Sequence, residues 1–382
     1  MAAAAERTLG EQIRGGVVIT PLPAGADGPA PCLSRVFETM VGGHPVPTAG
    51  SEEAGRRALT IARSLASDEV LLVLLSGGAS AVMVAPSPGV SLEDKRQTTA
   101  RLLRAGADIH ALNTVRKHLS AIKGGQLATA APGACVTLAI SDVVGDDLSV
   151  VGSGPTVADS STFASALEKL RKFGGVEVYP KAVVARLTAG TRDELPETPK
   201  PGDSSIGRSA ARVIGGRKDA MTGASAKAQA LGYQVIQIDE PVVGEARVAA
   251  AQHLAFALLK ARASGRPACV ISSGETTVHV KGAGKGGRNQ EFALASADAL
   301  ASAGTAAVGA SVGTDGVDGP TDAAGAIVDS TTIERIRAAG LPDPAHYLEQ
   351  NNTYELFSRL GDLINTGPTG TNVGDLQVLL LS

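Results

Sequence analysis

The chain has 382 residues, which is too long for one small module and, at roughly 100 to 200 residues per domain, predicts two domains or three. A composition of 43% apolar and 19% charged residues, with no Trp, excludes a chain that is mainly disordered. The 35 Lys and Arg against 38 Asp and Glu leave a formal net charge of −3, so no overall field attracts nucleic acid or an anionic membrane, and a small ligand is favoured.

Two features predict the compartment. Cys32, Cys135 and Cys269 are far apart, form no ligand-spaced pair and are odd in number, so we expect buried free thiols in a reducing cytosol. Gly and Pro break the longest uncharged stretch, Val70–Ser91, and Glu6 follows the N-terminal alanines directly. We therefore expect a cytoplasmic protein with neither a membrane span nor a signal peptide.

Short apolar runs alternate with longer amphipathic segments, which predicts an α/β fold with a mostly parallel sheet. A segment with three prolines, Thr188–Ser205, predicts a linker and hence domains at 1–205 and 206–382. In chain order, strands are predicted at Val17–Thr20, Val70–Leu75, Cys135–Ile140, Gln234–Ile238, Ala268–Ile271 and Ala306–Val312, and helices at Ser51–Ala66, Leu92–Ala105, Ser161–Phe173, Ala220–Leu231, Ala246–Arg262 and Asn289–Ser302.

Ligands of open α/β sheets bind beyond the carboxyl ends of the strands, so the residues there carry the candidate chemistry. The strand Val70–Leu75 is followed by a turn of small residues from Ser76 to Ser80, which contains Gly77 and Gly78. Such a turn lets backbone amides approach a phosphate or carboxylate, although a Gly-Gly turn is also common for steric reasons alone.

The strand Cys135–Ile140 leads into Asp142, Asp146 and Asp147, and then into a Ser-Gly-Pro-Thr segment at 153–156. Neighbouring carboxylates repel one another unless a cation joins them, which favours Mg²⁺ binding or base catalysis. A helix cap at Asp142 with solvated acids after it is an equal alternative.

Between these two strands, the segment Asn113–Leu119 and the nearby Lys123 group Arg116, Lys117 and a histidine. These cations can hold a substrate carboxylate or phosphate, with Arg suited to a two-bond grip. The alternative is an exposed basic helix face, with His118 packed or capping.

The last third is richest in such signals. Gly282, Gly284 and Gly287 satisfy the G-x-G-x-x-G spacing, but no acid follows about twenty residues later, and Arg288 and Asn289 stand where a P-loop needs Lys and Ser or Thr. A nucleotide would therefore bind in another way. Beyond the strand Ala306–Val312, the acids at 315 and 318 form either a metal-binding turn or a plain β-turn, and the loop 366–372 is either an anion nest or a connection.

Taken together, these strand ends resemble phosphoryl-transfer machinery, with amides and cations for phosphate and carboxylates for metal and base. In their order they resemble the type-two glycerate kinases, a family whose C-terminal half is called the MOFRL domain and some of whose members are named hydroxypyruvate reductase. The matching segments are 43–47 (GHPVP), 75–81 (LSGGASA), 113–120 with 123–125 (NTVRKHLS, KGG), 141–147 (SDVVGDD), 153–156 (SGPT), 274–276 (GET), 286–291 (GGRNQE), 313–316 (GTDG) and 366–372 (TGPTGTN).

The resemblance implies transfer of the ATP γ-phosphoryl group to the 2-hydroxyl of D-glycerate, with Mg²⁺. It also implies a Rossmann-like N-terminal domain with a mostly parallel sheet, a smaller C-terminal α/β domain and an active site in the cleft between them. Arg288 would be the cation at the transferring group, and Asp142 and Asp315 would be metal ligand and base, in an order that is left open. The nucleotide or phosphate would contact Gly77, Gly78, Ser80, Ser153, Gly154, Thr156, Glu275, Gly287 and Asn289, and the substrate would contact Arg116 and Lys123.

One departure from the family concerns the start of the chain. Family members begin with a further helix and a strand that ends in a Gly-Lys-Ala turn whose lysine is thought to be catalytic, whereas this sequence starts within the following alanine-rich helix. We expect the turn to be absent, which leaves an unpaired sheet edge and makes a homodimer a candidate assembly. The alternatives are a nicotinamide-dependent hydroxypyruvate reductase and an inactive nucleotide-binding shell.

Overall fold

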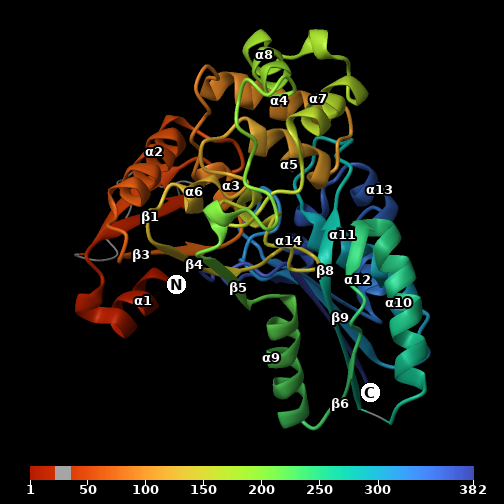
Figure 1. Ribbon diagram of the computed structural model, residues 1–382. Helices are drawn as coiled ribbons and strands as arrows, with labels where there is room; N and C mark the ends of the chain where they lie inside the picture. The colour runs from red at the N-terminus through yellow and green to blue at the C-terminus, as the bar shows by residue number, and fades with distance from the viewer. Residues whose placement is uncertain (22–35, 266) are drawn as a thin grey trace. The chain divides into compact units, whose positions relative to one another are not determined.

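The computed structural model describes residues 1–21, 36–265 and 267–382, and it has the predicted α/β architecture (Figure 1). The chain forms two compact units. Unit 1 comprises Met1–Ala139 and Asp147–Ile214, and unit 2 comprises Ile140–Asp146 and Gly215–Ser382. Cys135 and Cys269 are buried free thiols, as predicted, and Cys32 lies outside the described residues.

Unit 1 contains parallel strand pairs, as expected for the N-terminal half. Val70 on β3 pairs with Ala134 on β4, and Val17 on β1 pairs with Glu38 on β2. β5 joins the free side of β4. The elements are α1 (Ala2–Leu9), β1 (Gly16–Pro21), β2 (Phe37–Gly42), α2 (Ala49–Ser64), β3 (Val70–Leu75), α3 (Ala79–Val82), α4 (Leu92–Arg104), α5 (Ile109–His118), α6 (Gln126–Thr129), β4 (Ala134–Ile140), α7 (Phe163–Lys172), α8 (Lys181–Gly190) and β5 (Ser209–Gly215).

Side-chain caps fix where several of these helices begin. Ser91 Oγ accepts the backbone N–H of Asp94 at 3.1 Å before α4, and the Asp94 carboxylate accepts the N–H of Ser91 in return at 2.9 Å. Asp108 caps α5 through the N–H of Ala111 at 2.7 Å. Helices α4, α5, α7 and α8 lie together (Figure 1), and their apolar faces form one core around residues such as Leu102, Val115, Phe163, Leu170 and Leu187.

Unit 2 is built on a seven-stranded sheet, counted over its described residues, in the order β11-β10-β9-β12-β8-β6, with β7 also paired to β8. β6 and β7 run parallel to β8, whereas β12 is antiparallel to both β8 and β9. The elements are α9 (Arg217–Ala230), β6 (Gln234–Gln237), β7 (Val242–Glu245), α10 (Ala246–Arg262), β8 (Ala268–Thr277), α11 (Arg288–Ala301), β9 (Ala307–Gly313), β10 (Gly325–Asp329), α12 (Thr332–Ala338), α13 (Pro344–Glu349), α14 (Thr353–Leu360), β11 (Leu363–Ile364) and β12 (Asp375–Leu381).

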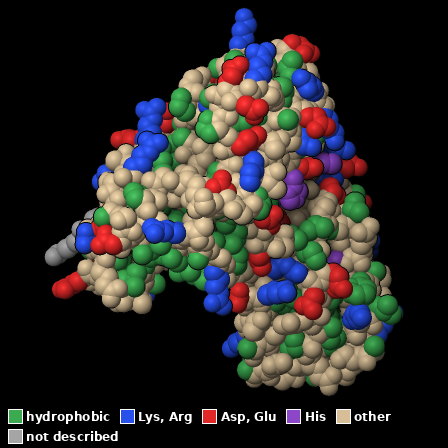
Figure 2. Space-filling view, in the orientation of Figure 1, with side chains coloured by type: hydrophobic (Ala, Val, Ile, Leu, Met, Phe, Trp, Pro, Cys, Tyr) green, Lys and Arg blue, Asp and Glu red, His purple; other side chains and the backbone are tan. Residues whose placement is uncertain are grey.

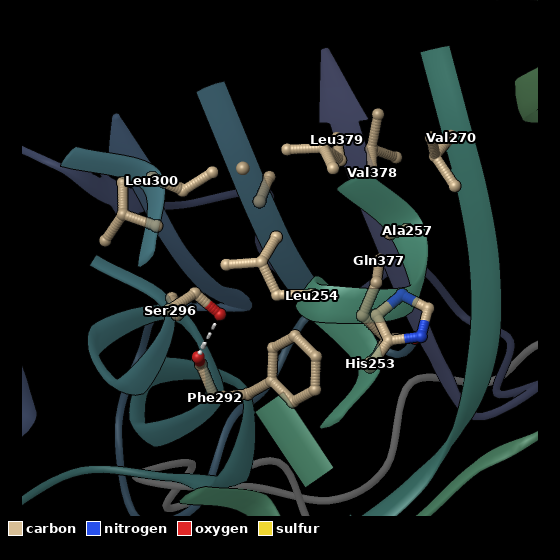
Figure 3. A pocket seen from close by; sticks show the side chains of 14 residues that line it. His253, Leu254, Ala257, Val270, Phe292, Ser296, Leu300, Gln377, Val378 and Leu379 are labelled. Atoms are coloured by element: carbon tan, nitrogen blue, oxygen red, sulfur yellow. Dashed lines mark hydrogen bonds between the residues drawn. The ribbon is translucent and has the colours of Figure 1, made fainter. Parts of the chain in front are cut away.

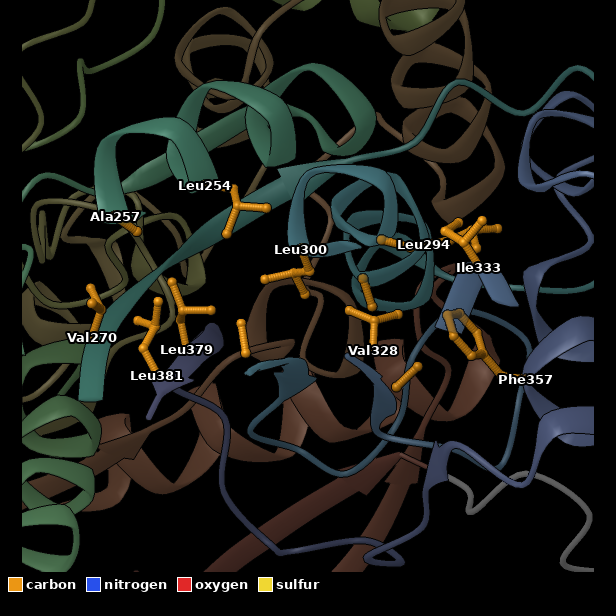
Figure 4. Packing of buried hydrophobic residues seen from close by; sticks show 14 of the residues in the cluster. Leu254, Ala257, Val270, Leu294, Leu300, Val328, Ile333, Phe357, Leu379 and Leu381 are labelled. Atoms are coloured by element: carbon orange, nitrogen blue, oxygen red, sulfur yellow. The ribbon is translucent and has the colours of Figure 1, made fainter. Parts of the chain in front are cut away.

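Both faces of this sheet are covered. Leu379 and Leu381 of β12 belong to the core that α10 and α11 complete with Leu254 and Leu300 (Figure 4). The alternate residues of β12 face a second cluster that contains Met221 of α9. The central strands are therefore held rigidly from both sides, and it is at the ends of β8, β9 and β12 that the polar residues of unit 2 gather.

Candidate active site

The candidate site in unit 2 centres on Arg288, the first residue of α11. Its Nε donates to Asp375 Oδ2 at 2.7 Å and its Nη2 to Asp375 Oδ1 at 2.9 Å, so the guanidinium and the carboxylate form a two-bond fork. The Asp375 side chain is fully buried, whereas 31% of the Arg288 side chain is exposed. Burial would lower the pKa of Arg288, but the bonds and charge of Asp375 outweigh it and hold the pKa above its usual value.

A second buried acid, Asp318, fixes the start of the same helix. Gly287 is the residue that precedes α11, and Asp318 accepts the N–H groups of Asn289 at 3.0 Å and Gln290 at 2.9 Å. Burial, the largest effect, raises the pKa of Asp318 to about 6 despite these bonds. The carboxylate thus caps α11 from a loop that lies about thirty residues further along the chain.

A further carboxylate, that of Glu275, lies near this cation, and the charges of Asp142 and Asp315 act on Glu275. Glu275 lies 3.7 Å from Arg288, and partial burial together with the charges of Asp142, Asp375 and Asp315 raises the pKa of Glu275 to about 6, against the effect of Arg288. The structure therefore brings together four of the predicted residues, namely Arg288, Glu275, Asp142 and Asp315, around a region of excess negative charge. Such a region favours a cation.

Both predicted metal-or-base residues also serve their own loops. Asp315 accepts the N–H of Val317 at 3.0 Å within a β-turn that Gly316 closes. Asp142 accepts from Asn372 at 3.1 Å, which joins the loop after β4 to the hydroxyl-rich loop before β12. Neither contact removes the carboxylate from the site, because each oxygen atom can accept more than one bond.

Among the residues that the structure describes, no group of three or more His, Cys, Asp or Glu side chains is arranged to hold a metal ion. Mg²⁺ usually binds one or two carboxylates, and phosphate oxygens and water complete its shell. Asp142 and Asp315 fit that requirement in number and type, and one loop contacts both residues: Asn372 donates to the Asp142 carboxylate at 3.1 Å, and the N–H of Thr369 donates to the carbonyl of Asp315 at 3.1 Å.

The candidate residues of unit 1 form a cluster of their own within that unit, around the turn after β3. Gly77 and Gly78 lead into α3. Gly78 has a φ of +80°, and a Cβ at this position would lie 3.0 Å from the ring of His44. The conformation and the space both require glycine. Ser80 follows, and its hydroxyl contacts that of Ser153 at 2.8 Å.

Two of the predicted substrate cations meet Ser80. Lys123 Nζ donates to Ser80 Oγ at 2.7 Å and to its carbonyl at 2.8 Å, and Arg116 donates to the same carbonyl at 3.5 Å. Lys123 is 2% exposed, and burial followed by the charges of Arg116 and Lys95 lowers its pKa well below the usual value. The exposed-basic-face alternative is therefore wrong, because these cations are buried or half-buried and oxygen atoms of the loops hold them.

The remaining predicted residues of unit 1 are internal. Ser153 is fully buried and donates to Asn113 at 2.9 Å, the carbonyl of Gly154 accepts from the backbone N–H of Gly125 at 2.7 Å, and Thr156 accepts from another buried threonine. Ser153 adjoins the cluster through Ser80. Thr156 is 2% exposed, and its hydroxyl accepts from Thr137 in the interior of unit 1.

The structure adds one residue that the sequence analysis did not name and new roles for two that it did. Asp375 holds the guanidinium of Arg288, Asp318 caps the Arg288 helix, and the buried Asn113 has an amide nitrogen with no hydrogen-bond partner within the described residues. One signal for Asp375 existed, namely an acid that directly precedes the last apolar run of the chain. His118, by contrast, packs edge-on against Phe163, which agrees with the alternative that His118 has a packing role.

A small pocket elsewhere in unit 2 does not compete with these clusters. It lies between α10, α11 and the sheet, and apolar side chains such as Leu254, Phe292 and Leu379 line it together with His253 (Figure 3). Its volume of about 30 Å³ is far below the few hundred cubic ångströms that an organic ligand occupies. It is a packing space in the core.

The distribution of surface charge indicates no particular macromolecular partner. On the face shown in Figure 2, acidic and basic side chains are interspersed, which agrees with the small net charge. Within the described ranges, no helix combines the length and the apolar character that a membrane crossing would need.

An α/β chain with a clamped arginine among carboxylates, and glycine turns beside buried cations, has the features of a phosphoryl-transfer enzyme. Comparison with known proteins agrees. A domain of unknown function, DUF4147, matches residues 1–188, and the MOFRL family matches residues 268–375. The D-glycerate 2-kinase of Thermotoga maritima is 41% identical over 385 residues, which cover 100% of this chain and 88% of that protein.

Two further matches are a solved structure and a relative that carries a different enzyme name. A crystal structure of the glycerate kinase of Thermotoga maritima superimposes with a TM-score of 0.86 over 100% of this chain and 88% of the other, at 41% identity. A protein of Agrobacterium vitis, provisionally named a hydroxypyruvate reductase, is 39% identical over 100% of this chain and 84% of its own length. The chain belongs to the glycerate kinase family with the MOFRL domain, as the sequence motifs predicted.

Proposed function

We propose that the protein catalyses ATP-dependent phosphorylation of D-glycerate at its 2-hydroxyl, giving 2-phosphoglycerate and ADP. The observation that carries the proposal is the similarity along the whole chain to a protein named D-glycerate 2-kinase. The geometry supports it, because phosphoryl transfer needs fixed positive charge at the transferring group and carboxylates for a metal and a proton.

In unit 2, Arg288 would stabilise the charge on the transferring phosphoryl group, with Gly287 and Asn289 beside it at the start of α11. Asp142 and Asp315 would hold Mg²⁺, which supplies charge neutralisation to the phosphates of ATP when bound. Glu275 would accept the proton of the 2-hydroxyl, since a pKa of about 6 leaves it mostly ionised at pH 7 and still able to take up a proton.

In unit 1, Arg116 would hold the glycerate carboxylate, because a guanidinium can form two parallel bonds to a carboxylate. Lys123 would act with it by fixing Ser80, whose hydroxyl and carbonyl both accept from Lys123 Nζ. The Gly77-Gly78 turn would present backbone amides to an anion.

The test is a measurement of ADP release by the full chain with ATP, Mg²⁺ and D-glycerate. We expect release that depends on D-glycerate, and ³¹P NMR of the product should show phosphate at the 2-position. Release that is indifferent to glycerate would refute the proposal. Nucleotide binding by calorimetry without any turnover would instead select the inactive shell.

The glycine spacing that motivated a reductase has another cause in the structure. A Cβ on Gly282 would lie 2.2 Å from the carbonyl oxygen of Gln350, and one on Gly284 would lie 2.4 Å from the Cβ of Asn352. These glycines let two loops of unit 2 approach each other, so their spacing gives no support to dinucleotide binding. Addition of hydroxypyruvate and NADH should leave the absorbance at 340 nm unchanged.

A further inference from the structure

We infer that Asp375 is a positioning residue for Arg288, which it holds in the single orientation that phosphoryl transfer requires. The inference rests on the proposed function, which places Arg288 at the transferring group. It assigns no contact between Asp375 and a substrate.

The fork between the two side chains fixes the orientation of the Arg288 guanidinium as well as stabilising its charge. Arg288 uses Nε and Nη2, at 2.7 and 2.9 Å, so one edge of its planar guanidinium faces Asp375. The opposite end, with Nη1 and the outer hydrogen of Nη2, points away from Asp375 and is the part able to meet phosphoryl oxygens. Glu275, at 3.7 Å from Nη2, is beyond hydrogen-bond distance and can contribute charge but no such orientation.

Asp375 is itself held rigidly. It is the first residue of β12, opposite Gly274 of β8 and Gly313 of β9, and its side chain is fully buried. Asn289 donates to its Oδ1 at 2.9 Å, and the same amide accepts from Ser311 Oγ at 2.6 Å. The carboxylate is therefore anchored to a central strand while the long side chain of Arg288, 31% exposed, depends on it for its orientation.

The decisive variant is Asp375→Asn, which keeps the shape and removes the second acceptor of the fork. We expect kcat to fall by roughly 100-fold, as expected for a displacement of about 1 Å, while the KM values for ATP and D-glycerate stay within about twofold. In an Arg288→Ala background, the same change should alter kcat by less than about twofold, because the two residues act as one unit.

The matched control is Asp362→Asn. Asp362 also pairs with an arginine, but end-on: Arg335 Nη1 donates to Asp362 Oδ1 at 3.0 Å, and Nη2 lies 2.9 Å from Oδ2 as an ion pair. The Arg335 side chain is 34% exposed, close to the exposure of Arg288. This pair lies outside the candidate site, so the change should leave kcat unaltered. A further variant, Arg288→Lys, keeps the charge without the fork, and we expect it to lose kcat as Asp375→Asn does.

A spectroscopic readout is independent of turnover. With ¹⁵N-labelled arginine, the Nε–H resonance of Arg288 should be protected from exchange in the wild type and in Asp362→Asn, and should lose that protection in Asp375→Asn. Three results would overturn the inference. They are retained protection of the Arg288 Nε–H in Asp375→Asn, retained kcat in Asp375→Asn or Arg288→Lys, and a loss of kcat on Asp375→Asn that is equally large with and without Arg288. A wild type without kinase activity would refute the proposed function instead, and the resonance would still decide whether Asp375 orients Arg288.

Discussion

Replacement of Asp318 by Asn should change how the stability of the protein depends on pH. Asp318 is 1% exposed and caps α11 through the N–H groups of Asn289 and Gln290. Burial raises its pKa from 3.8 to about 6, so the folded protein binds this proton more tightly than the unfolded chain does. The stability gained from protonation is therefore complete below pH 3.8 and is lost as the pH rises through 6.

The size of the effect follows from the pKa. At about 1.36 kcal/mol for each pKa unit, the rise from 3.8 to about 6 corresponds to about 3 kcal/mol in the free energy of unfolding. Asn does not titrate, and it loses one of the two acceptors, which costs about 0.5 to 2 kcal/mol at any pH. The advantage of the wild type over Asp318→Asn should thus shrink by about 2.4 kcal/mol between pH 4 and pH 7, which is most of the full effect.

Urea unfolding followed by far-UV circular dichroism is the suitable assay, because the chain has no Trp to report by fluorescence. The measured quantity is the difference in unfolding free energy between wild type and Asp318→Asn at several values of pH. A difference that stays constant, or an advantage of the wild type that grows with pH, would refute the reasoning. The second result would mean that the helix N-terminus lowers the pKa of Asp318 more than burial raises it.

Three further predictions test the site and its surroundings. Glu275→Gln should lower kcat by about 100-fold, because the proton acceptor is lost. In the wild type, kcat should fall below about pH 6 as Glu275 becomes protonated, and pH-rate profiles should show no such fall in the variant. Gly282→Ala, whose new Cβ would meet Gln350, should destabilise by about 1 to 3 kcal/mol in thermal melts, whereas Gly223→Ala, with open space around it, should not. Removal of Mg²⁺ by a chelator should abolish ADP formation, and Asp142→Asn should raise the Mg²⁺ concentration needed to restore it; activity without any divalent cation would contradict both assignments.

Much of the fold was predictable because local signals agree with it. The strand at Val70–Leu75 and the helix at Ala246–Arg262 have the predicted limits, since Gly, Pro or capping residues bound an apolar or amphipathic run. β8 is longer than predicted because its second half, Ser272–Thr277, is polar and is held by pairing with β12 and β7. β12 itself carried an apolar run at 376–381 that the sequence analysis overlooked.

The candidate site was predictable in its residue types but not in its arrangement. Motifs located Arg288, Glu275 and Asp142, yet the partner of Arg288 lies 87 residues away and is set by the register of β12. Lys123 was identified as a cation, but its burial depends on the folding of two loops around it. Pairing and burial are properties of the whole chain, which short sequence patterns do not encode.

The assignment of the loop Ile140–Asp146 to unit 2 limits how the protein can be dissected. A fragment expressed from residue 206 onward would contain Arg288, Glu275 and Asp375 but would lack Asp142, and Asn372 would lose its carboxylate acceptor. In such a truncate, the pKa of Glu275 would lose the contribution of Asp142, which raises it, while burial of Glu275 remains the main cause of the raised pKa. Biochemistry on the excised C-terminal half would therefore describe a different electrostatic environment, unless a synthetic peptide spanning 140–146 restored it.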